Sequence, residues 1–519
     1  MSHIIVGAIA MREGMTLRAK NLIVLVLMLV MLSAPQLSAI MQLAATQQGP
    51  DVQAIDAYLE SKLRQYRIPG LAIAIVKGDQ VIHVKGFGIA DPDKRSVTPD
   101  TPFILGSVSK SFTALAIMQL VDAGKVNLDA PVQQYLPWFS VADRQAASQI
   151  TVRHLLNQTS GISTRAGQEQ LTDNDTSEGA LEKHVRNLKT ARLSQPVGKQ
   201  FQYSNANYNI LGMIVQTVSG MSYEQYIQQH IFTPLDMRHS YTSQDQAQKA
   251  TPSLSVGNRF WFGYPVATEV PYNRGELPAG YLISSVEDMA HYLICHLNDG
   301  RYKDVTLVSS ARMAELHQPA VKAGDDISYG MGWYVLNVNG VPIVNHPGEV
   351  ANYSSNITLI PSERWGVVLL TNVYPGVTGA SIMQLYKGVI SLLVDRSPPT
   401  IKNHFLTNLL VIALPTLFVL QLLRLFRAFI MWRRWRTRSE LTHLGAKSLL
   451  RHIGLPLVLD GAIAAGLLIG LPLLFAPLPV MLFFQPDLTG IAIISGTLAL
   501  SGALLRIGFS IRLLLKTSP

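Results

Sequence analysis

Cysteine is almost absent from this chain, since Cys295 is the only one among 519 residues. A single cysteine excludes an intramolecular disulfide and any metal site built on several cysteines. The sequence also contains no internal repeat and no long low-complexity segment. A repeat architecture is therefore not expected.

Charged residues are also scarce, at 15% of the chain against about 25% in ordinary globular proteins. Hydrophobic residues make up 48%, and the mean hydropathy is +0.22, which is too apolar for a purely soluble protein. The net charge of +9 is compatible with nucleic-acid binding, but many of the basic residues flank long apolar segments. In that position they orient membrane helices and contact anionic headgroups, so we expect no nucleic-acid partner.

The N-terminal apolar segment has the pattern of an export signal. Arg12, Arg18 and Lys20 precede Leu22–Leu32, and small residues follow as far as Ala39. This pattern predicts that residues 1–39 are a secretory signal peptide or an uncleaved N-terminal anchor. Either would export the segment that follows.

The C-terminal region, residues 401–519, is predicted to be a membrane domain with three transmembrane helices. A span needs about 20 apolar residues, and three segments approach or exceed that length: Phe405–Leu423, Ile453–Phe475 and Leu488–Leu505. Arginines cluster between the first two segments, and further basic residues follow the third. The positive-inside rule makes both clusters cytoplasmic and places the domain at residues 40–400 on the extracytoplasmic side of the cell membrane. Asp460, inside the second segment, is expected to sit near the cytoplasmic end of that span or to be satisfied by a neighbouring helix, although a functional role is the alternative.

Residues 51–395 alternate between helical and strand-like segments. A helix is expected at Asp51–Tyr66, and a hairpin follows, built from Leu71–Val76 and Gln80–Phe87. Further helices are expected at Ser107–Ala123, Asn205–Val218 and Ser222–Ile231. Strands return late in the segment, with turns at Asn339-Gly340 and Pro361-Ser362: Gly330–Val338, Val341–Asn345, Ser354–Ile360 and Trp365–Thr371. The order predicts one sheet built from both ends of the domain.

Ser107-Val108-Ser109-Lys110 is the most informative motif, and it is the only Ser-x-x-Lys in the chain. Residues three apart on a helix share a face, so Ser107 and Lys110 are expected to point the same way. The helix N-terminus and burial both disfavour a charged lysine, and a neutral amine can take the proton of the serine. The motif therefore predicts a nucleophile next to its base, although the spacing alone could arise by chance.

Two further motifs follow in order. Tyr203-Ser204-Asn205 stands before a predicted helix, where the phenol can relay protons and the carboxamide can hold a substrate carbonyl or the lysine ammonium. A core tyrosine with a helix-capping asparagine is the alternative. His346-Pro347-Gly348 follows a predicted strand, where His346 could donate to a substrate carboxylate or oxyanion and Gly348 would allow close approach.

Taken in order, Ser-x-x-Lys, Tyr-x-Asn and His-x-Gly resemble the class C β-lactamase-like branch of the serine β-lactamases and penicillin-binding proteins. Thr151–Gly161, Tyr203–Gly212 and Pro278–Ser285 extend the resemblance, which covers residues 51–395. It implies an α/β (α+β) fold in which an antiparallel sheet is flanked by helices and joined to an all-helical lobe.

The resemblance also implies an acyl-enzyme mechanism without a metal or organic cofactor. Ser107 would attack a carbonyl, while Lys110 and Tyr203 share the proton transfers, with either one as the base. Asn205 would position the substrate. The backbone N–H groups of Ser107 and Glu349 would hold the oxyanion.

Two departures from the family pattern bear on the substrate. His346 replaces the lysine of Lys-Thr-Gly, and Glu349 stands where a small residue is usual. Both argue against efficient β-lactam hydrolysis. The function expected first is therefore a membrane-tethered extracytoplasmic serine hydrolase acting on small peptides or esters, in the manner of D-aminopeptidases, carboxypeptidases and esterases. A β-lactamase proper is one alternative, and a penicillin-binding sensor or partner-binding membrane protein without efficient turnover is another, because three spans exceed what tethering requires.

Overall fold

The computed structural model describes residues 51–338, 340–374, 376, 379–394, 396–398, 405–437 and 446–517. The predicted signal peptide or anchor at residues 1–39 lies outside these ranges. So does Asn339 of the predicted Asn339-Gly340 turn.

An eight-stranded antiparallel sheet forms the centre of the N-terminal domain, in the order β2-β1-β14-β13-β12-β11-β10-β9. Its early strand β1 pairs with the late strand β14, with Leu71 opposite Thr371, so the sheet is built from both ends of the domain as predicted. The strands are β1 (Gly70–Lys77), β2 (Gln80–Gly88), β9 (Val321–Gly324), β10 (Ile327–Gly330), β11 (Trp333–Val338), β12 (Val341–Val350), β13 (Tyr353–Ile360) and β14 (Trp365–Thr371).

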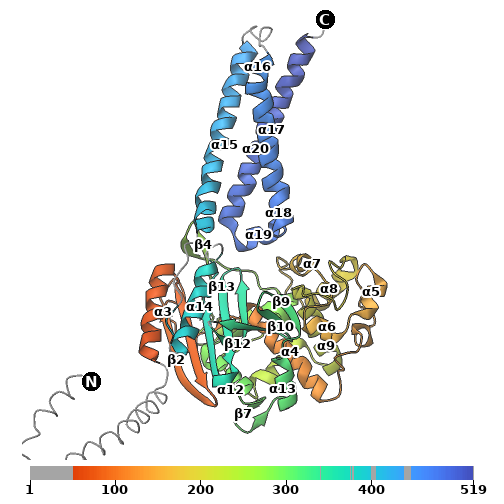
Figure 1. Cartoon of the computed structure of the whole chain (residues 1–519), viewed down its shortest axis with the longest axis vertical. Coiled ribbons are helices and arrows are strands. Elements are labelled where there is room, and N and C mark those ends of the chain that lie inside the picture. Colours follow the sequence, from red (N-terminus) through yellow and green to blue (C-terminus); the bar gives the residue numbers. More distant parts are fainter. Residues whose placement is uncertain are drawn as a thin grey trace, which may run out of the picture.

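Helices cover both faces of this sheet (Figure 1). Successive side chains of a strand point to opposite faces. Ile73 of β1 packs into one core with α3 (Val52–Tyr66) and α14 (Gly379–Leu393), whereas Ala72 and Ala74 belong to the other core, which contains α4 (Ser109–Asp122) and α12 (Val286–Leu297). The predicted helix at Asp51–Tyr66 corresponds to α3, for which Asp51 is the N-cap.

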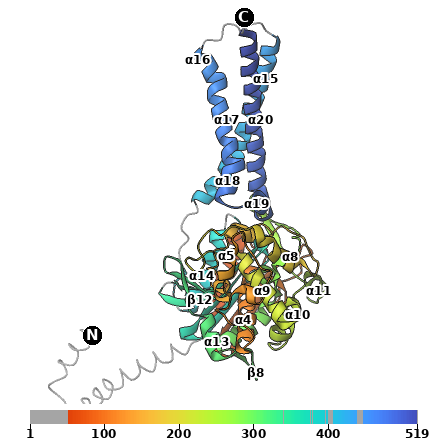
Figure 2. The ribbon, with the colours of Figure 1, turned by 90° about the vertical axis from the view of Figure 1, so that its right-hand side faces the viewer.

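The all-helical lobe is made mainly from the segment between α4 and β6, and it packs beside the sheet (Figure 2). Its helices are α5 (Arg144–Gln149), α6 (Val152–Leu156), α7 (Thr164–Gln168), α8 (Ala180–Asn187), α9 (Asn205–Ser219), α10 (Tyr223–Ile227) and α11 (Gln244–Lys249); α13 (Ser310–Leu316) follows later. Short pairings complete the domain: β3 (Phe103–Ile104) with β6 (Ile283–Ser284), β7 (Arg301–Tyr302) with β8 (Val305–Thr306), and β15 (Val373–Tyr374) with β4 (Asn258–Trp261) and β5 (Tyr264–Ala267).

Three predicted boundaries were wrong. The strand expected at Val341–Asn345 continues to Val350, because β12 still pairs with β13 after its pairing with β11 ends at Asn345. Pro347 lies in this one-sided stretch, where a missing N–H is tolerated. The strand expected at Gly330–Val338 is two strands, since Gly332 turns the chain with a φ of +92°. Ser222–Ile231 is α10 followed by a π-helical segment, Gln228–Phe232.

The described residues of the C-terminal region form a bundle with three helices long and apolar enough to cross a membrane: Val411–Arg433, Leu450–Leu474 and Pro486–Ile511. The first lies further along the chain than the predicted Phe405–Leu423. The elements of the bundle are α15 (Phe405–Thr437), α16 (Ala446–Leu449), α17 (Leu455–Ala465), α18 (Leu471–Leu474), α19 (Leu478–Phe484) and α20 (Pro486–Thr517).

Asp460 joins the three long helices of this bundle. Its carboxylate, on α17, forms an ion pair of 2.7 Å with Arg424 of α15 and a second ion pair with Arg506 of α20. A lone charge at membrane depth is costly, and pairing removes most of that cost. The expectation that a neighbouring helix satisfies Asp460 is confirmed.

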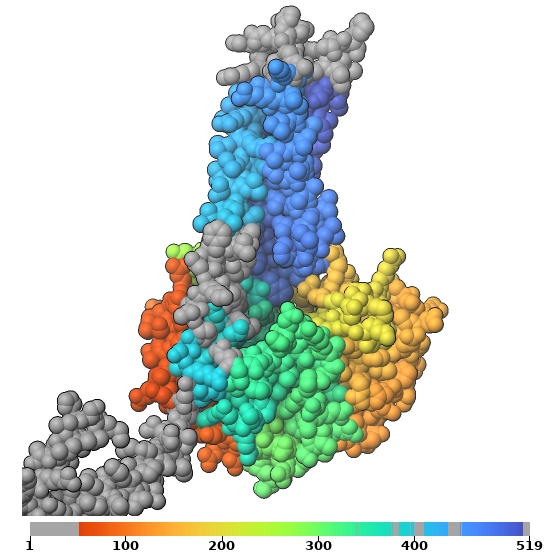
Figure 3. Space-filling model, viewed as in Figure 1, coloured from red at the N-terminus to blue at the C-terminus, as the bar shows by residue number. Residues whose placement is uncertain are grey.

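The bundle stands on the N-terminal domain at one end only (Figure 3). That end carries α19, which connects α18 to α20, while α16 and the C-terminal end of α15 lie at the opposite end (Figure 1). The backbone N–H of Phe262, at the turn between β4 and β5, donates to Asp487 Oδ2 over 2.8 Å. The N-terminal end of the third long helix therefore touches the domain directly.

Candidate active site

Ser107 lies in a tight 3-10 turn, Gly106–Val108, directly before α4, rather than in the first turn of α4 itself. The turn depends on Gly106, whose φ is +55°, and a Cβ added there would lie 2.5 Å from the backbone nitrogen of Glu349. Only glycine accepts this combination of backbone angle and crowding. Ser107 keeps part of its surface open.

Lys110 is completely buried and is surrounded by three oxygen atoms. Its Nζ lies 3.0 Å from Ser107 Oγ, 2.8 Å from Asn205 Oδ1 and 2.6 Å from the carbonyl oxygen of Ala279. The amide and carbonyl oxygens only accept hydrogen bonds, so they occupy two N–H donors of the lysine in either protonation state. In the neutral amine the lone pair is then left for the hydroxyl proton of Ser107.

Burial lowers the pKa of Lys110 to about 7, and the negative charge of Glu276 partly opposes this shift. A pKa near neutrality allows one group both to take and to return a proton. Lys110 therefore has the contacts and the electrostatics that a general base requires.

Tyr203 approaches Ser107 from the other side, and its hydroxyl donates to Ser107 Oγ over 2.8 Å. Burial, followed by the neighbouring Tyr329 and Tyr334, raises the pKa of Tyr203 well above its usual value. The phenol therefore keeps its proton and acts as a donor toward Ser107.

Asn205 does not cap its helix, which settles the alternative left open by the sequence. Ser204 occupies the N-cap position of α9, and Asn205 is the first residue of the helix. Its Oδ1 accepts from Lys110. The carboxamide thus links the helical lobe to the lysine on α4.

His346 is buried, and its role as a hydrogen-bond donor to substrate is not supported by its contacts. Its Nδ1 lies 2.7 Å from the Pro347 carbonyl oxygen, which can only accept, so Nδ1 carries the proton. Its Nε2 lies 3.5 Å from Tyr329 OH and is left as an acceptor. Burial, with Lys110 as a second cause, lowers the pKa of His346 to about 3, so the ring is neutral at pH 7.

Gly348 and Glu349 bring the backbone of β12 against the Ser107 turn. A Cβ on Gly348 would collide with the Leu105 carbonyl oxygen and would lie 3.1 Å from Ser107 N. The backbone nitrogens of Ser107 and Glu349 therefore lie on two segments in direct contact, as an oxyanion site made from both would require. Glu349 lines the small cavity beside Ser107, and partial burial raises the pKa of its carboxyl. It also keeps solvent-exposed surface, because the cavity leaves one side of it open.

Sequence reasoning assigned no role to four residues that the structure places at the site. Ala279 supplies the third oxygen at Lys110, and its segment had been noted only for its resemblance to the family. Glu276, Phe483 and Phe484 line the same cavity as Ser107. No short motif marks these three, because they come from distant parts of the chain.

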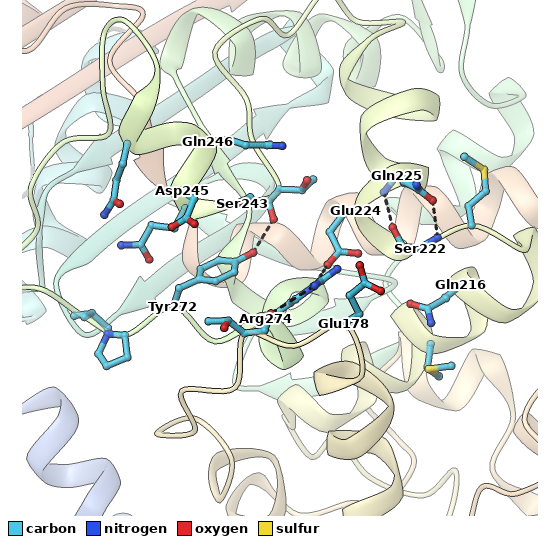
Figure 4. Close-up of a pocket in the computed structure, with 18 of the residues that line it drawn as sticks. Glu178, Gln216, Ser222, Glu224, Gln225, Ser243, Asp245, Gln246, Tyr272 and Arg274 are labelled. Atoms are coloured by element: carbon cyan, nitrogen blue, oxygen red, sulfur yellow. Dashed lines mark hydrogen bonds and ion pairs between the residues drawn. The ribbon is translucent and has the colours of Figure 1, made fainter.

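A cleft larger than the cavity beside Ser107 lies elsewhere on the surface. It has a volume of about 1370 Å³ and is lined by polar residues that include Glu178, Glu224 and Arg274 (Figure 4). Arg274 Nε is 2.6 Å from Glu224 Oε1, so the arginine of this cleft is already paired. The cleft borders the C-terminal half of α9, whereas Asn205 begins that helix, and it contains none of the predicted site residues. Size therefore does not identify the active site here.

Comparison with known proteins agrees with the geometry. Residues 53–385 match the family model described as Beta-lactamase. Protein flp of Staphylococcus aureus (strain MW2) is 30% identical over 391 residues, which cover 74% of this chain and 75% of that protein. Penicillin-binding protein 4 of Amycolatopsis lactamdurans is 31% identical over 353 residues, covering 65% of this chain and 89% of that protein. Among solved structures, the octameric penicillin-binding protein homologue from Pyrococcus abyssi aligns with a TM-score of 0.59 at 30% identity, over 67% of this chain and 78% of that one.

Proposed function

Because the chain belongs to the beta-lactamase family, we propose that it is a membrane-tethered serine hydrolase that cleaves ester or peptide bonds through an acyl-enzyme on Ser107. The observation that carries this proposal is the pair of contacts at Ser107 Oγ. Lys110 Nζ lies 3.0 Å away and the Tyr203 hydroxyl 2.8 Å away. A serine with an adjacent buried amine and an adjacent protonated phenol has the parts that nucleophilic catalysis needs.

The contacts favour Lys110 over Tyr203 as the base in the first step. Neutral Lys110 takes the Ser107 proton while Oγ attacks the substrate carbonyl carbon. The backbone N–H groups of Ser107 and Glu349 hold the resulting oxyanion. Tyr203 then donates its proton to the leaving atom, and the Lys110 ammonium restores the phenol. Lys110, which is neutral again, takes a proton from the water that attacks the acyl carbon and returns it to Ser107 Oγ as the acid is released.

The surroundings of the site favour a general acyl hydrolase over a β-lactamase proper. Binding a β-lactam or peptide carboxylate calls for a nearby cation, but His346 is neutral at pH 7. Glu276 and Glu349 instead bring carboxyl groups to the cavity beside Ser107. An anionic group there would meet the negative charge of Glu276.

Penicillin binding without turnover remains the second candidate, because two of the similar proteins are named as penicillin-binding proteins or homologues of them. In that case an acyl-enzyme would form on Ser107 and persist.

The apolar bundle supports a multi-pass membrane location for the enzyme. The domain and the α16 end of the bundle lie at opposite ends of the three long helices. Arg424 and Arg433 lie in the half of α15 that leads to the α16 end. By the positive-inside rule, this arrangement puts the Ser107 domain outside the cytoplasm.

Turnover of an activated ester tests the proposed function. The detergent-solubilised full chain is expected to hydrolyse p-nitrophenyl acetate, and Ser107→Ala is expected to lose that activity, because it removes the hydroxyl that contacts both Lys110 and Tyr203. Release of p-nitrophenol is followed by absorbance, and nitrocefin turnover is measured alongside and is expected to be much slower.

Full activity in Ser107→Ala would contradict the mechanism. Stable labelling of the wild-type chain by a fluorescent penicillin, with no ester turnover, would favour the penicillin-binding sensor instead.

A further inference from the structure

The short helix α19 lies between the bundle and the Ser107 domain (Figures 1 and 2). Aromatic contacts hold it there. The rings of Phe484 and Tyr374 lie 5.1 Å apart between centroids, and the Arg259 guanidinium lies 5.4 Å from the centre of the Phe483 ring. The hydrogen bond from Phe262 N to Asp487, just after α19, adds a polar contact at the same junction.

This helix closes the cavity next to the nucleophile. The cavity is lined by Ser107 and Asn205 of the catalytic group, by the carboxyl groups of Glu276 and Glu349, and by Phe483 and Phe484 of α19; apolar side chains such as Val350 complete it. One small space therefore contains the reacting hydroxyl and two aromatic rings supplied by the C-terminal region.

We propose, on the basis of the proposed hydrolase function, that Phe483 and Phe484 are specificity-determining residues that select acyl substrates carrying an apolar group. Aromatic rings give a bound apolar group a large, rigid contact surface. Glu276 and Glu349, which also line the cavity, disfavour an anionic substituent, so the preferred acyl part is uncharged or bears an amine. The catalytic group and its apolar subsite then lie at the end of the membrane bundle, where amphiphilic substrates collect.

The size of the cavity shows how the selection works. Its volume is about 40 Å³. That is roughly the share of one water molecule, whereas pockets for small ligands measure about 300–1000 Å³. A substrate with more than a few atoms must therefore displace lining side chains, and we expect the two phenyl rings to move because they stand on the separate helix α19. An apolar group regains contact with the displaced rings, and a polar group does not.

Chain-length preference tests the proposal on the detergent-solubilised full chain. The kcat/KM for p-nitrophenyl octanoate is divided by that for p-nitrophenyl acetate. The double variant Phe483→Ala, Phe484→Ala is expected to lower this ratio about tenfold or more, since even small changes in apolar pocket contact alter specificity by that factor. The matched control is Phe475→Ala, because Phe475 follows α18 and is 72% exposed. Its ratio is expected to equal that of the wild type, which also corrects for uptake of octanoate by micelles.

An unchanged ratio in the double variant would overturn the specificity role while leaving the hydrolase function intact. If the wild-type chain hydrolyses neither ester and no adduct forms on Ser107, that result would contradict the proposed function itself.

If the double variant fails to fold, a cysteine introduced into α19 tests the specificity proposal instead. The chain carrying Phe484→Cys is treated with a maleimide after Ser107 has reacted with either an octyl or a methyl fluorophosphonate. The native Cys295 is buried, and burial raises its pKa to about 12, so background labelling is slow. We expect the octyl group to protect the new thiol and the methyl group to leave it reactive. Equal labelling after both reagents would contradict the proposal.

Discussion

Replacing Lys110 by methionine is expected to lower kcat/KM for p-nitrophenyl acetate by about a thousandfold at about pH 8, within the range that general-base catalysis supplies. Methionine is close to lysine in length and apolar, so it fills the buried site but cannot take the Ser107 proton. Lys110→Arg is the informative companion, because it keeps a positive charge and is not deprotonated at this pH. We expect both variants to be inactive, as measured by initial rates of ester hydrolysis.

The pH profile gives a graded form of the same test. With the pKa of Lys110 at about 7, the neutral amine is present above that pH, so kcat/KM should rise through neutrality and level off above it. The Glu276 carboxylate stabilises the ammonium form and raises this pKa. Glu276→Gln should therefore move the midpoint of the rise to lower pH. Substantial activity in Lys110→Met, or a midpoint that moves upward in Glu276→Gln, would contradict Lys110 as the base.

Gly348→Ala is expected to reduce kcat by about a hundredfold, comparable to the loss of one oxyanion donor. The added methyl group would collide with the Leu105 carbonyl oxygen and the Ser355 hydroxyl, and would press on Ser107 N. β12 and the Ser107 turn would have to separate, and the backbone nitrogens of Ser107 and Glu349 would separate with them. Steady-state kinetics measures the loss.

Gly179→Ala is the matched control for this substitution. Gly179 precedes α8 with a φ of −81°, and a Cβ there meets nothing within 4 Å. Its kcat should equal that of the wild type, and thermal unfolding of both variants separates local displacement from loss of the fold. Wild-type kcat in a folded Gly348→Ala variant would argue against an oxyanion site between these two segments.

The positions of the candidate catalytic residues could be predicted because each motif is short and lies at an element boundary. Ser107 and Lys110 lie three residues apart where the 3-10 turn passes into α4, and Tyr203 and Asn205 lie at the start of α9, so local sequence already places each pair. The order of the motifs then indicated that the pairs meet. The sheet could be predicted for a similar reason, since the apolar strands occur early and late in the domain.

The remaining features depend on tertiary contacts that no short pattern records. His346 looked like a donor at the end of a strand, but β12 continues past it, and its proton is directed to the Pro347 carbonyl. Glu276 reaches the site through the π-helical and 3-10 turns near Ala279. Phe483 and Phe484 resembled ordinary apolar residues between two spans, and only the placement of the bundle on the domain brings them to Ser107.

Ser107 as the nucleophile is the central claim, and the mass of the intact full chain after reaction with a fluorophosphonate tests it most directly. We predict the addition of one phosphonyl group, mapped by peptide analysis to Ser107, and no addition in Ser107→Ala. An adduct on a different residue, or an equal adduct in Ser107→Ala, would contradict the account.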